Sequence, residues 1–215
     1  PNYVLTTVPD VTLSKQIGYP LGYDHNTVLT HPNFPGKNDN IGFKYSQPNY
    51  SSVFSVLGPR FFITASQTKF LLAEAAYRGW ITGDVETLYN EGIAASMEQY
   101  ANYPGGYGEI SEDEIEDYIA GANVAYDASK ALELINTEYW VSNLNNPLEG
   151  WANFRRSGFP RLAVNPMNQL SGDGFIHRVP YPTQESGSNP DNYAAARAAM
   201  GILPDNSNDT TTRVF

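Results

Sequence analysis

The amino-acid sequence predicts a mainly α-helical chain in which paired helices are flanked by long irregular loops. Residues 59–157 carry apolar side chains at spacings of three and four, which is the periodicity of amphipathic helices. Residues 1–58 are rich in turn-forming residues and lack that periodicity. Residues 158–215 return to loops, with one alanine-rich helix expected near Pro190–Met200. We therefore expect a helical array between two loop-rich segments.

Composition narrows the function classes. The chain has 215 residues, enough for one large domain or an extended helical array, and it lacks an apolar run of about 18 residues that could span a membrane. The hydrophobic share of 41% and the charged share of 17% are typical of globular proteins. A net charge of −10 argues against nucleic acid and anionic lipid as partners, because both require a basic surface. Cysteine is absent, which excludes disulfides, thiolate metal sites and cysteine nucleophiles from this chain.

The first helix pair is predicted in the middle of the chain. The segment "FFITASQTKFLLAEAAYRGW" is apolar on nearly every side around Phe70–Tyr77, so we expect this helix to be buried between neighbours. A second helix follows in "GDVETLYNEGIAASMEQY", where the small residues Gly92 and Ser96 permit close approach of another helix. A turn near Ile81–Gly83 joins the two into an antiparallel pair. Their pattern resembles a tetratricopeptide repeat.

A second helix pair is expected further along the chain. Ser111 and Glu114 fit a capping box at the start of "SEDEIEDYIAG". The segment "DASKALELINTEYWVSNL" is amphipathic through Leu132, Ile135 and Tyr139. We expect these two helices to form a pair of similar shape to the first. Stacked helix pairs form scaffolds, which bind partners more often than they catalyse.

The stretch "EGWANFRRSGFPRL" interleaves arginines with aromatic rings, which suits either a ligand site or a structural cluster. We favour a structural role, with Arg155 and Arg156 paired to carboxylates while Trp151 and Phe154 pack. Glu74 stands alone in the apolar first helix, and a buried carboxylate without a partner is costly. We therefore predict that Glu74 pairs with one of these arginines or with a nearby hydroxyl or backbone group.

Four segments, taken together, resemble a known family. "FITASQTKFLLAEAAYRG" is similar to the entry to the helical repeats in the C-terminal half of SusD-like (RagB-like) outer-membrane lipoproteins. "EYWVSNLNNPLEGWANFRRSGFPRL" resembles the W-x-x-x-R-R-x-G-x-P block that follows in the family. "HRVPYPTQESGSNPDNYAAA" and "TTRVF" resemble the segments near the family's C-terminus. The order and approximate spacing of all four segments match over about residues 62–215.

The resemblance implies that residues 1–215 are the C-terminal part of a SusD-like domain, with its N-terminal half and lipidated cysteine outside this chain. It implies a place on the outer face of Bacteroidetes outer membranes, reached only through that lipid anchor. Such proteins form a lid on a SusC-like, TonB-dependent transporter and deliver glycans to it, or in some branches peptides. The family is not enzymatic, and the resemblance implies no cofactor.

The matching segments are structural, so no sugar-binding residue of the family is carried over to this chain. A glycan site needs exposed rings to stack on the C–H faces of sugars, and amides or carboxylates to bind hydroxyl groups. The chain supplies both, with 15 Tyr and 10 Phe residues and many loop asparagines. Five loop tyrosines have no periodic reason to be buried and are our candidate ligand contacts: Tyr23, Tyr45, Tyr50, Tyr103 and Tyr107.

Two other functions remain open. A peptide-binding or protein-binding scaffold would show a concave helical groove lined by polar side chains. A glycoside hydrolase would hold paired acids about 5–9 Å apart in a cleft. No metal site is predicted, because the three histidines are scattered over loops. The segment "DNSND" at Asp205–Asp209 opens like a calcium loop, but Thr210 stands where glycine is needed.

Overall fold

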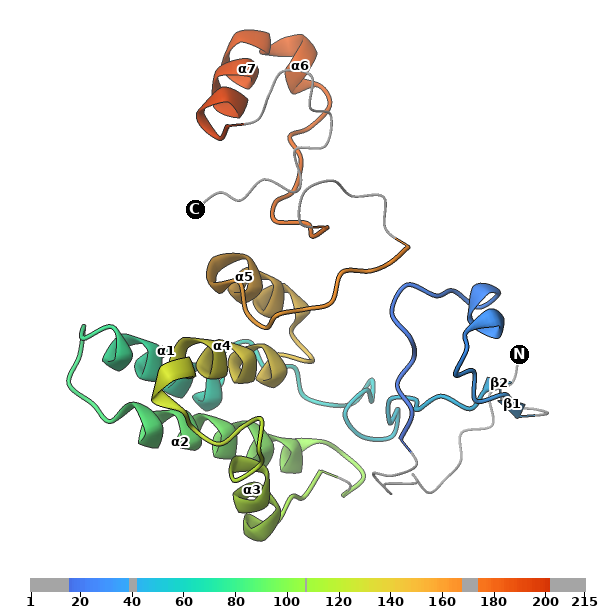
Figure 1. Ribbon diagram of the computed structural model, residues 1–215, viewed down its shortest axis with the longest axis vertical. Helices are drawn as coiled ribbons and strands as arrows, with labels where there is room; N and C mark the ends of the chain where they lie inside the picture. The colour runs from blue at the N-terminus through green and yellow to red at the C-terminus, as the bar shows by residue number, and fades with distance from the viewer. Residues whose placement is uncertain (1–15, 39–41, 107, 168–173, 202–215) are drawn as a thin grey trace. The chain divides into compact units, whose positions relative to one another are not determined.

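The computed structural model describes residues 16–38, 42–106, 108–167 and 174–201, and these residues are mainly helical, as predicted (Figure 1). The α-helices are α1 (Ala65–Tyr77), α2 (Val85–Glu98), α3 (Glu112–Ile119), α4 (Ala131–Ser142), α5 (Pro147–Ser157), α6 (Glu185–Ser188) and α7 (Pro190–Ala199). Short 3-10 turns span η2 (Thr27–Thr30), η3 (Gln99–Asn102) and η4 (Ala128–Lys130), and two antiparallel strands span β1 (Lys37–Asn38) and β2 (Gly42–Phe43).

The chain divides into two compact units. One unit consists of residues 47–162 and holds α1 to α5. The other unit consists of residues 1–46 and 163–215 and holds the short strands, α6 and α7. The predicted alanine-rich helix is α7, which begins at Pro190, a residue suited to the first turn because it needs no hydrogen-bond partner for its nitrogen.

Helices α1 and α2 form the predicted antiparallel pair (Figure 1). Thr64 and Gln67 close a capping box at the start of α1, and the side chain of Asp84 accepts a hydrogen bond from the Thr87 N–H at the start of α2. Gly92 allows the close approach, since a Cβ there would lie 2.7 Å from the Phe70 ring. The small residue predicted in α2 is therefore a point of close contact with α1.

The core of this unit joins three helices. Its buried side chains are Phe70, Ala73, Tyr89, Ile93, Ala131, Ile135 and Tyr139, contributed by α1, α2 and α4. As expected, α1 packs between neighbouring helices, with Phe70, Ala73 and Glu74 buried, but part of its apolar surface stays open. Leu71 is 49% exposed and Tyr77 is 45% exposed, because α2 and α4 cover only part of the surface of α1.

The predicted pairing of the third and fourth helices is wrong. Helix α3 begins with the predicted capping box of Ser111 and Glu114, but it packs mainly beside α2. Helix α4 instead packs on α1 and α5. The reason is the small apolar surface of α3, an eight-residue helix in which Ile115 is the buried residue. Helix α5 offers α4 a longer buried face.

Helix α5 carries the sequence "PLEGWANFRRS" and has well-defined ends. Pro147 lies in its first turn, and Gly158 ends it with a φ of 80°, a left-handed conformation that favours glycine. Glu149 lies in the first turn, and two arginines lie in the last, an arrangement that complements the helix dipole. These residues account for where α5 begins and ends.

Candidate functional site

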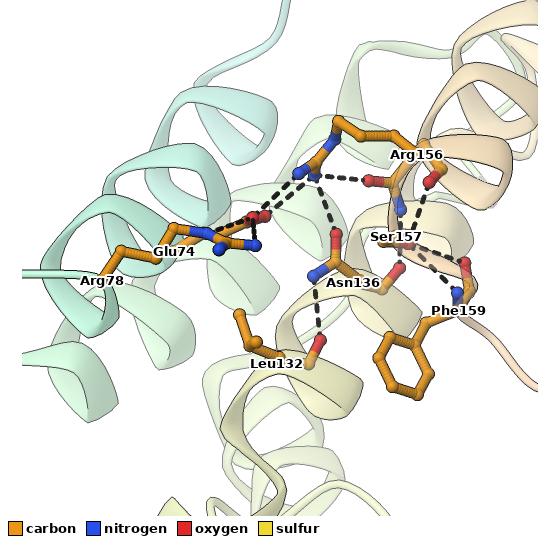
Figure 2. Close-up of polar contacts among 8 residues, drawn as sticks. Glu74, Arg78, Leu132, Asn136, Arg156, Ser157 and Phe159 are labelled. Atoms are coloured by element: carbon orange, nitrogen blue, oxygen red, sulfur yellow. Dashed lines mark hydrogen bonds and ion pairs between the residues drawn. The ribbon is translucent and has the colours of Figure 1, made fainter. Parts of the chain in front are cut away.

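A cluster of charged and amide side chains joins α1, α4 and α5 (Figure 2). We call it the Glu74 cluster, and its members are Glu74, Arg78, Asn136, Asn153 and Arg156. Arg156 donates two parallel hydrogen bonds to the Glu74 carboxylate, Nη1 to Oε1 and Nη2 to Oε2, each of 2.8 Å. Arg78 donates from Nε to Oε1 of the same carboxylate at 2.9 Å. The predicted pairing of Glu74 with an arginine of "FRRSG" is confirmed.

The two asparagines complete the Glu74 cluster. Nη2 of Arg156 also donates to Oδ1 of Asn136 at 3.0 Å and to Oδ1 of Asn153 at 2.9 Å. Asn136 in turn donates to the Leu132 carbonyl, and Asn153 donates to the Asn136 carbonyl. Each asparagine therefore holds the guanidinium with its oxygen and the backbone of α4 with its nitrogen.

The two arginines favour the ionised form of the Glu74 carboxyl. Burial alone raises the pKa of the Glu74 carboxyl, but the hydrogen bonds and charges of Arg156 and Arg78 outweigh it, and the net pKa is lowered. The hydrogen bonds that Arg156 donates to Glu74 raise the pKa of Arg156, against the opposing effect of burial. Glu74 is 5% exposed and its carboxylate is held by two arginines, whose side chains remain partly exposed.

The neighbouring arginine behaves differently. The Arg155 guanidinium lies over the Trp151 ring, 4.7 Å from its centroid, and Phe154 is buried. Adjacent residues on a helix point about 100° apart, so only Arg156 reaches the α1 carboxylate. The two arginines therefore make different contacts: Arg156 forms an ion pair with Glu74, and Arg155 stacks on Trp151.

A shallow groove of about 160 Å³ lies beside the Glu74 cluster. Its lining residues are Leu71, Tyr139, Glu149, Ala152, Asn153 and Arg156. The Tyr139 hydroxyl donates to Glu149 at 2.7 Å, and burial, followed by this bond, raises the pKa of Tyr139. The groove therefore combines the apolar side chains of Leu71 and Ala152 with the Glu149 carboxylate, which can accept further hydrogen bonds.

A second concavity lies around Tyr103, and we call it the Tyr103 cleft. Its volume is about 20 Å³, close to the space of a single water molecule. Its lining includes the rings of Phe61 and Tyr103 and the amides of Gln67, Gln99, Asn143, Asn145 and Asn146, with Arg60 nearby. Asn145 donates to the Tyr103 hydroxyl at 2.8 Å. The cleft has the groups that bind sugar hydroxyls, but a sugar ring could lie only across its mouth.

The five candidate tyrosines have different environments. Tyr50 is 53% exposed, with its ring near Phe54, and Tyr23 is partly buried against His31. Tyr45 and Tyr103 are buried, at 6% and 4% exposure, so neither ring offers an open face to a ligand. Tyr107 lies outside the described residues. Tyr23 and Tyr45 belong to one unit and Tyr50 and Tyr103 to the other.

The burial of the two rings follows from local aromatic clustering. Tyr45 packs edge-on to Tyr19, with 4.9 Å between ring centroids, and near Phe34 at 6.3 Å. Tyr103 packs edge-on to Phe61 at 5.8 Å. Loop aromatics that lie close in space bury one another without any sequence periodicity.

Sequence reasoning missed an exposed aromatic residue. Trp80 follows α1 directly and is 73% exposed. The available signal was its place after Gly79 in "YRGWITGD", between two predicted helices, where neither helix can bury it. A tryptophan in such a turn is unusual, because this side chain is strongly buried on average.

The titratable groups do not assemble into a metal centre in the part of the chain that the structure describes, where no group of three His, Asp or Glu side chains lies together. The calcium-like segment Asp205–Asp209 falls outside the described ranges. In those ranges no helix combines the length and the hydropathy needed to cross a membrane.

Comparison with solved structures gives the same fold. A SusD-like protein from Bacteroidetes AC2a is 33% identical, with a TM-score of 0.58 over 66% of this chain and 28% of its own. A chitin-binding protein is 34% identical, with a TM-score of 0.53 over 70% of this chain and 32% of its own. A SusD homologue from Bacteroides fragilis is 27% identical, with a TM-score of 0.57 over 68% of this chain and 33% of its own. This chain therefore spans about a third of the length of these proteins.

A comparison with curated protein sequences found no match. Residues 13–182 match the profile of the SusD-like_2 family, which is described as starch-binding and associating with the outer membrane. This match spans most of the chain and includes all five helices of the 47–162 unit. The chain belongs to the SusD-like family of outer-membrane-associated proteins.

Proposed function

We propose that this chain is part of a glycan-binding protein that captures oligosaccharides at the outer membrane. The observation that carries the proposal is the family match over residues 13–182, since the family is described as starch-binding. The similar solved structure at 34% identity is named as a chitin-binding protein. Starch and chitin are both chains of pyranose rings, so the proposed ligand is a pyranose oligosaccharide.

The side chains of the helical unit fit this ligand chemistry. Amides can donate to and accept from a sugar hydroxyl at the same time, and the Tyr103 cleft has partly exposed amides at Gln99, Asn145 and Asn146. The net charge of −10 suits a neutral glycan better than an acidic one. We propose that the ligand lies across the surface near such groups and does not enter a deep pocket.

The proposed role is binding without catalysis. The buried acids of the helical unit have structural partners: Glu74 is held by two arginines, and Glu138 accepts hydrogen bonds from Tyr118. Glu149 accepts from Tyr139. A glycoside hydrolase needs two acids directed at the sugar, and these three carboxylates are directed at protein groups.

The proposed location is the outer face of the outer membrane, through a lipid anchor outside this chain. There the protein would pass its ligand to a TonB-dependent, SusC-like transporter. This partner is part of the proposal and is tested by co-purification from membranes, in which the full-length protein and the transporter are expected to elute together.

Native affinity electrophoresis of the full-length protein tests glycan binding. We expect its migration to be retarded in gels that contain starch, a soluble chitin derivative or another pyranose polysaccharide, relative to serum albumin. Unchanged migration across the whole panel would count against the proposal.

The groove beside the Glu74 cluster favours a second candidate, a peptide ligand. Leu71 and Ala152 offer apolar contacts, and Glu149, which accepts from Tyr139 through Oε1, can accept a further hydrogen bond from a peptide N–H. Fluorescence anisotropy with labelled peptide libraries separates the two candidates. Peptide binding without gel retardation would replace the glycan proposal with this one.

A further inference from the structure

The exposed residue Trp80 lies at the end of α1, on the turn that leads into α2. It is 73% exposed, and its neighbours Tyr77 and Ile81 are 45% and 40% exposed. Leaving an indole in water forgoes the stabilisation that its burial would give. A large ring kept at the surface by a rigid turn is therefore a candidate for binding something.

The backbone that carries Trp80 is fixed by hydrogen bonds. The Trp80 N–H donates to the Ala75 carbonyl and the Gly79 N–H donates to the Ala76 carbonyl, each at 2.9 Å. Gly79 has a φ of 72°, which is the left-handed conformation that this type of helix ending requires. The ring thus projects from an ordered helix terminus, and little backbone freedom is lost when a ligand binds.

One face of the indole is supported by Arg78. The Arg78 guanidinium lies over the Trp80 ring, 5.4 Å from its centroid. Arg78 is itself held by Glu74, with Nε 2.9 Å and Nη2 2.8 Å from Oε1. The buried Glu74 cluster therefore extends to the surface through Arg78 and sets the position of the Trp80 side chain.

This arrangement leaves groups for a ligand. The remaining face of the indole is apolar, flat and accessible, which suits the C–H face of a pyranose ring. Among the residues that the structure describes, Nη1 of Arg78 has no hydrogen-bond partner, so it can donate to a ring hydroxyl at the edge of the indole. A ring for stacking and a hydrogen-bond donor beside it can together bind a sugar.

We propose that Trp80 and Arg78 form a pyranose-binding platform at the end of the α1–α2 pair. This inference rests on the proposed glycan function and assigns it a place on the helical repeats. The ligand class is a neutral oligosaccharide whose C–H face stacks on Trp80 while Arg78 donates to a hydroxyl.

The test compares Trp80→Ala with Phe62→Ala in the full-length protein. Phe62 is a matched control, because it is an 85% exposed aromatic residue that precedes α1 at the other end of the helix. For a glycan that the wild type binds in calorimetry, Trp80→Ala should weaken affinity by about 10-fold, the usual scale for an anchoring tryptophan. Phe62→Ala should leave affinity unchanged, and both variants should keep the wild-type melting temperature.

Chemical protection gives an independent readout. N-bromosuccinimide should oxidise Trp80 in the free full-length protein, and the bound glycan should slow that oxidation, as followed by peptide mass spectrometry. Wild-type affinity in Trp80→Ala, or a Trp80 that resists oxidation without glycan, overturns the platform and leaves the glycan function standing. A wild type that binds no glycan overturns both.

Discussion

The carboxylate of Glu74 is buried where α1, α4 and α5 meet, and its charge is balanced by Arg156 and Arg78. The need for a partner could be predicted, because Glu74 is the one acidic residue in an otherwise apolar segment. Which of Arg155 and Arg156 would be that partner could not be predicted, because the choice depends on the rotation of α5 against α4. Nor could the second arginine, Arg78, be predicted as a partner, although it lies one helical turn from Glu74.

Replacing Glu74 with glutamine tests this cluster. Two arginines would lose their counter-charge, so Glu74→Gln should lower the free energy of unfolding by about 2–3 kcal/mol, reduced from the fully buried case because Arg156 is partly exposed. Urea denaturation measures this change. Glu91→Gln is the control, since it removes an exposed partner of Lys69 and should cost less than about 0.5 kcal/mol. Equal losses in the two variants would show that the buried pair adds nothing.

The same substitution has a pH signature. The pKa of Glu74 in the folded chain is lowered below its ordinary value of 4.5, so its stabilising contribution is present above about pH 4.5 and is lost as pH falls through the lowered value. The stability gap between wild type and Glu74→Gln should therefore narrow in acid. A gap that stays constant down to pH 3 would contradict the lowered pKa.

Glu138 gives a prediction of the opposite sign. Burial raises its pKa above 4.5, and the hydrogen bond from Tyr118 opposes that rise without reversing it. Its protonated form therefore stabilises the fold below pH 4.5, and this contribution is lost as pH rises through the raised value. Glu138→Gln should melt at a higher temperature than wild type at pH 8 and at a similar temperature at pH 4. Thermal melts at both pH values measure this, and a variant less stable than wild type at pH 8 would contradict it.

Among the helices, the predicted α1–α2 pair is present in the structure, whereas the predicted α3–α4 pair is not. The first prediction succeeded because a short turn and a small residue at Gly92 fix two adjacent helices as neighbours. The second failed because chain order does not decide packing when a helix is as short as α3. The larger buried face of α5 takes the place beside α4.

Two glycines in helices give opposite predictions for alanine substitution. A Cβ on Gly92 would lie 2.7–3.0 Å from the Phe70 ring, so Gly92→Ala should destabilise by about 1–3 kcal/mol. A Cβ on Gly150 would lie at an ordinary 3.5 Å from the Trp140 ring, so Gly150→Ala should stabilise by about 0.5–1 kcal/mol through helix propensity. Chemical denaturation of both variants measures the difference. The packing of α1 on α2 would be wrong if Gly92→Ala were neutral.

At the scale of the whole chain, the family could be inferred from sequence while the ligand contacts could not. The block from Trp151 to Pro160 has a recognisable spacing, and its Arg156 joins α5 to α1 through Glu74. Ligand contacts on loops carry no such spacing, so exposure had to come from the structure. In the structure, Tyr45 and Tyr103 are buried in clusters of aromatic rings, whereas Trp80 is exposed.

The central claim is that the protein containing this chain binds pyranose oligosaccharides. Calorimetric titration of the full-length protein with malto-oligosaccharides and chito-oligosaccharides, together with a peptide library as comparison, tests it most directly. We expect saturable heat with at least one oligosaccharide series and none with the peptides. Absence of heat with every glycan, alongside saturable binding of a peptide, would contradict it.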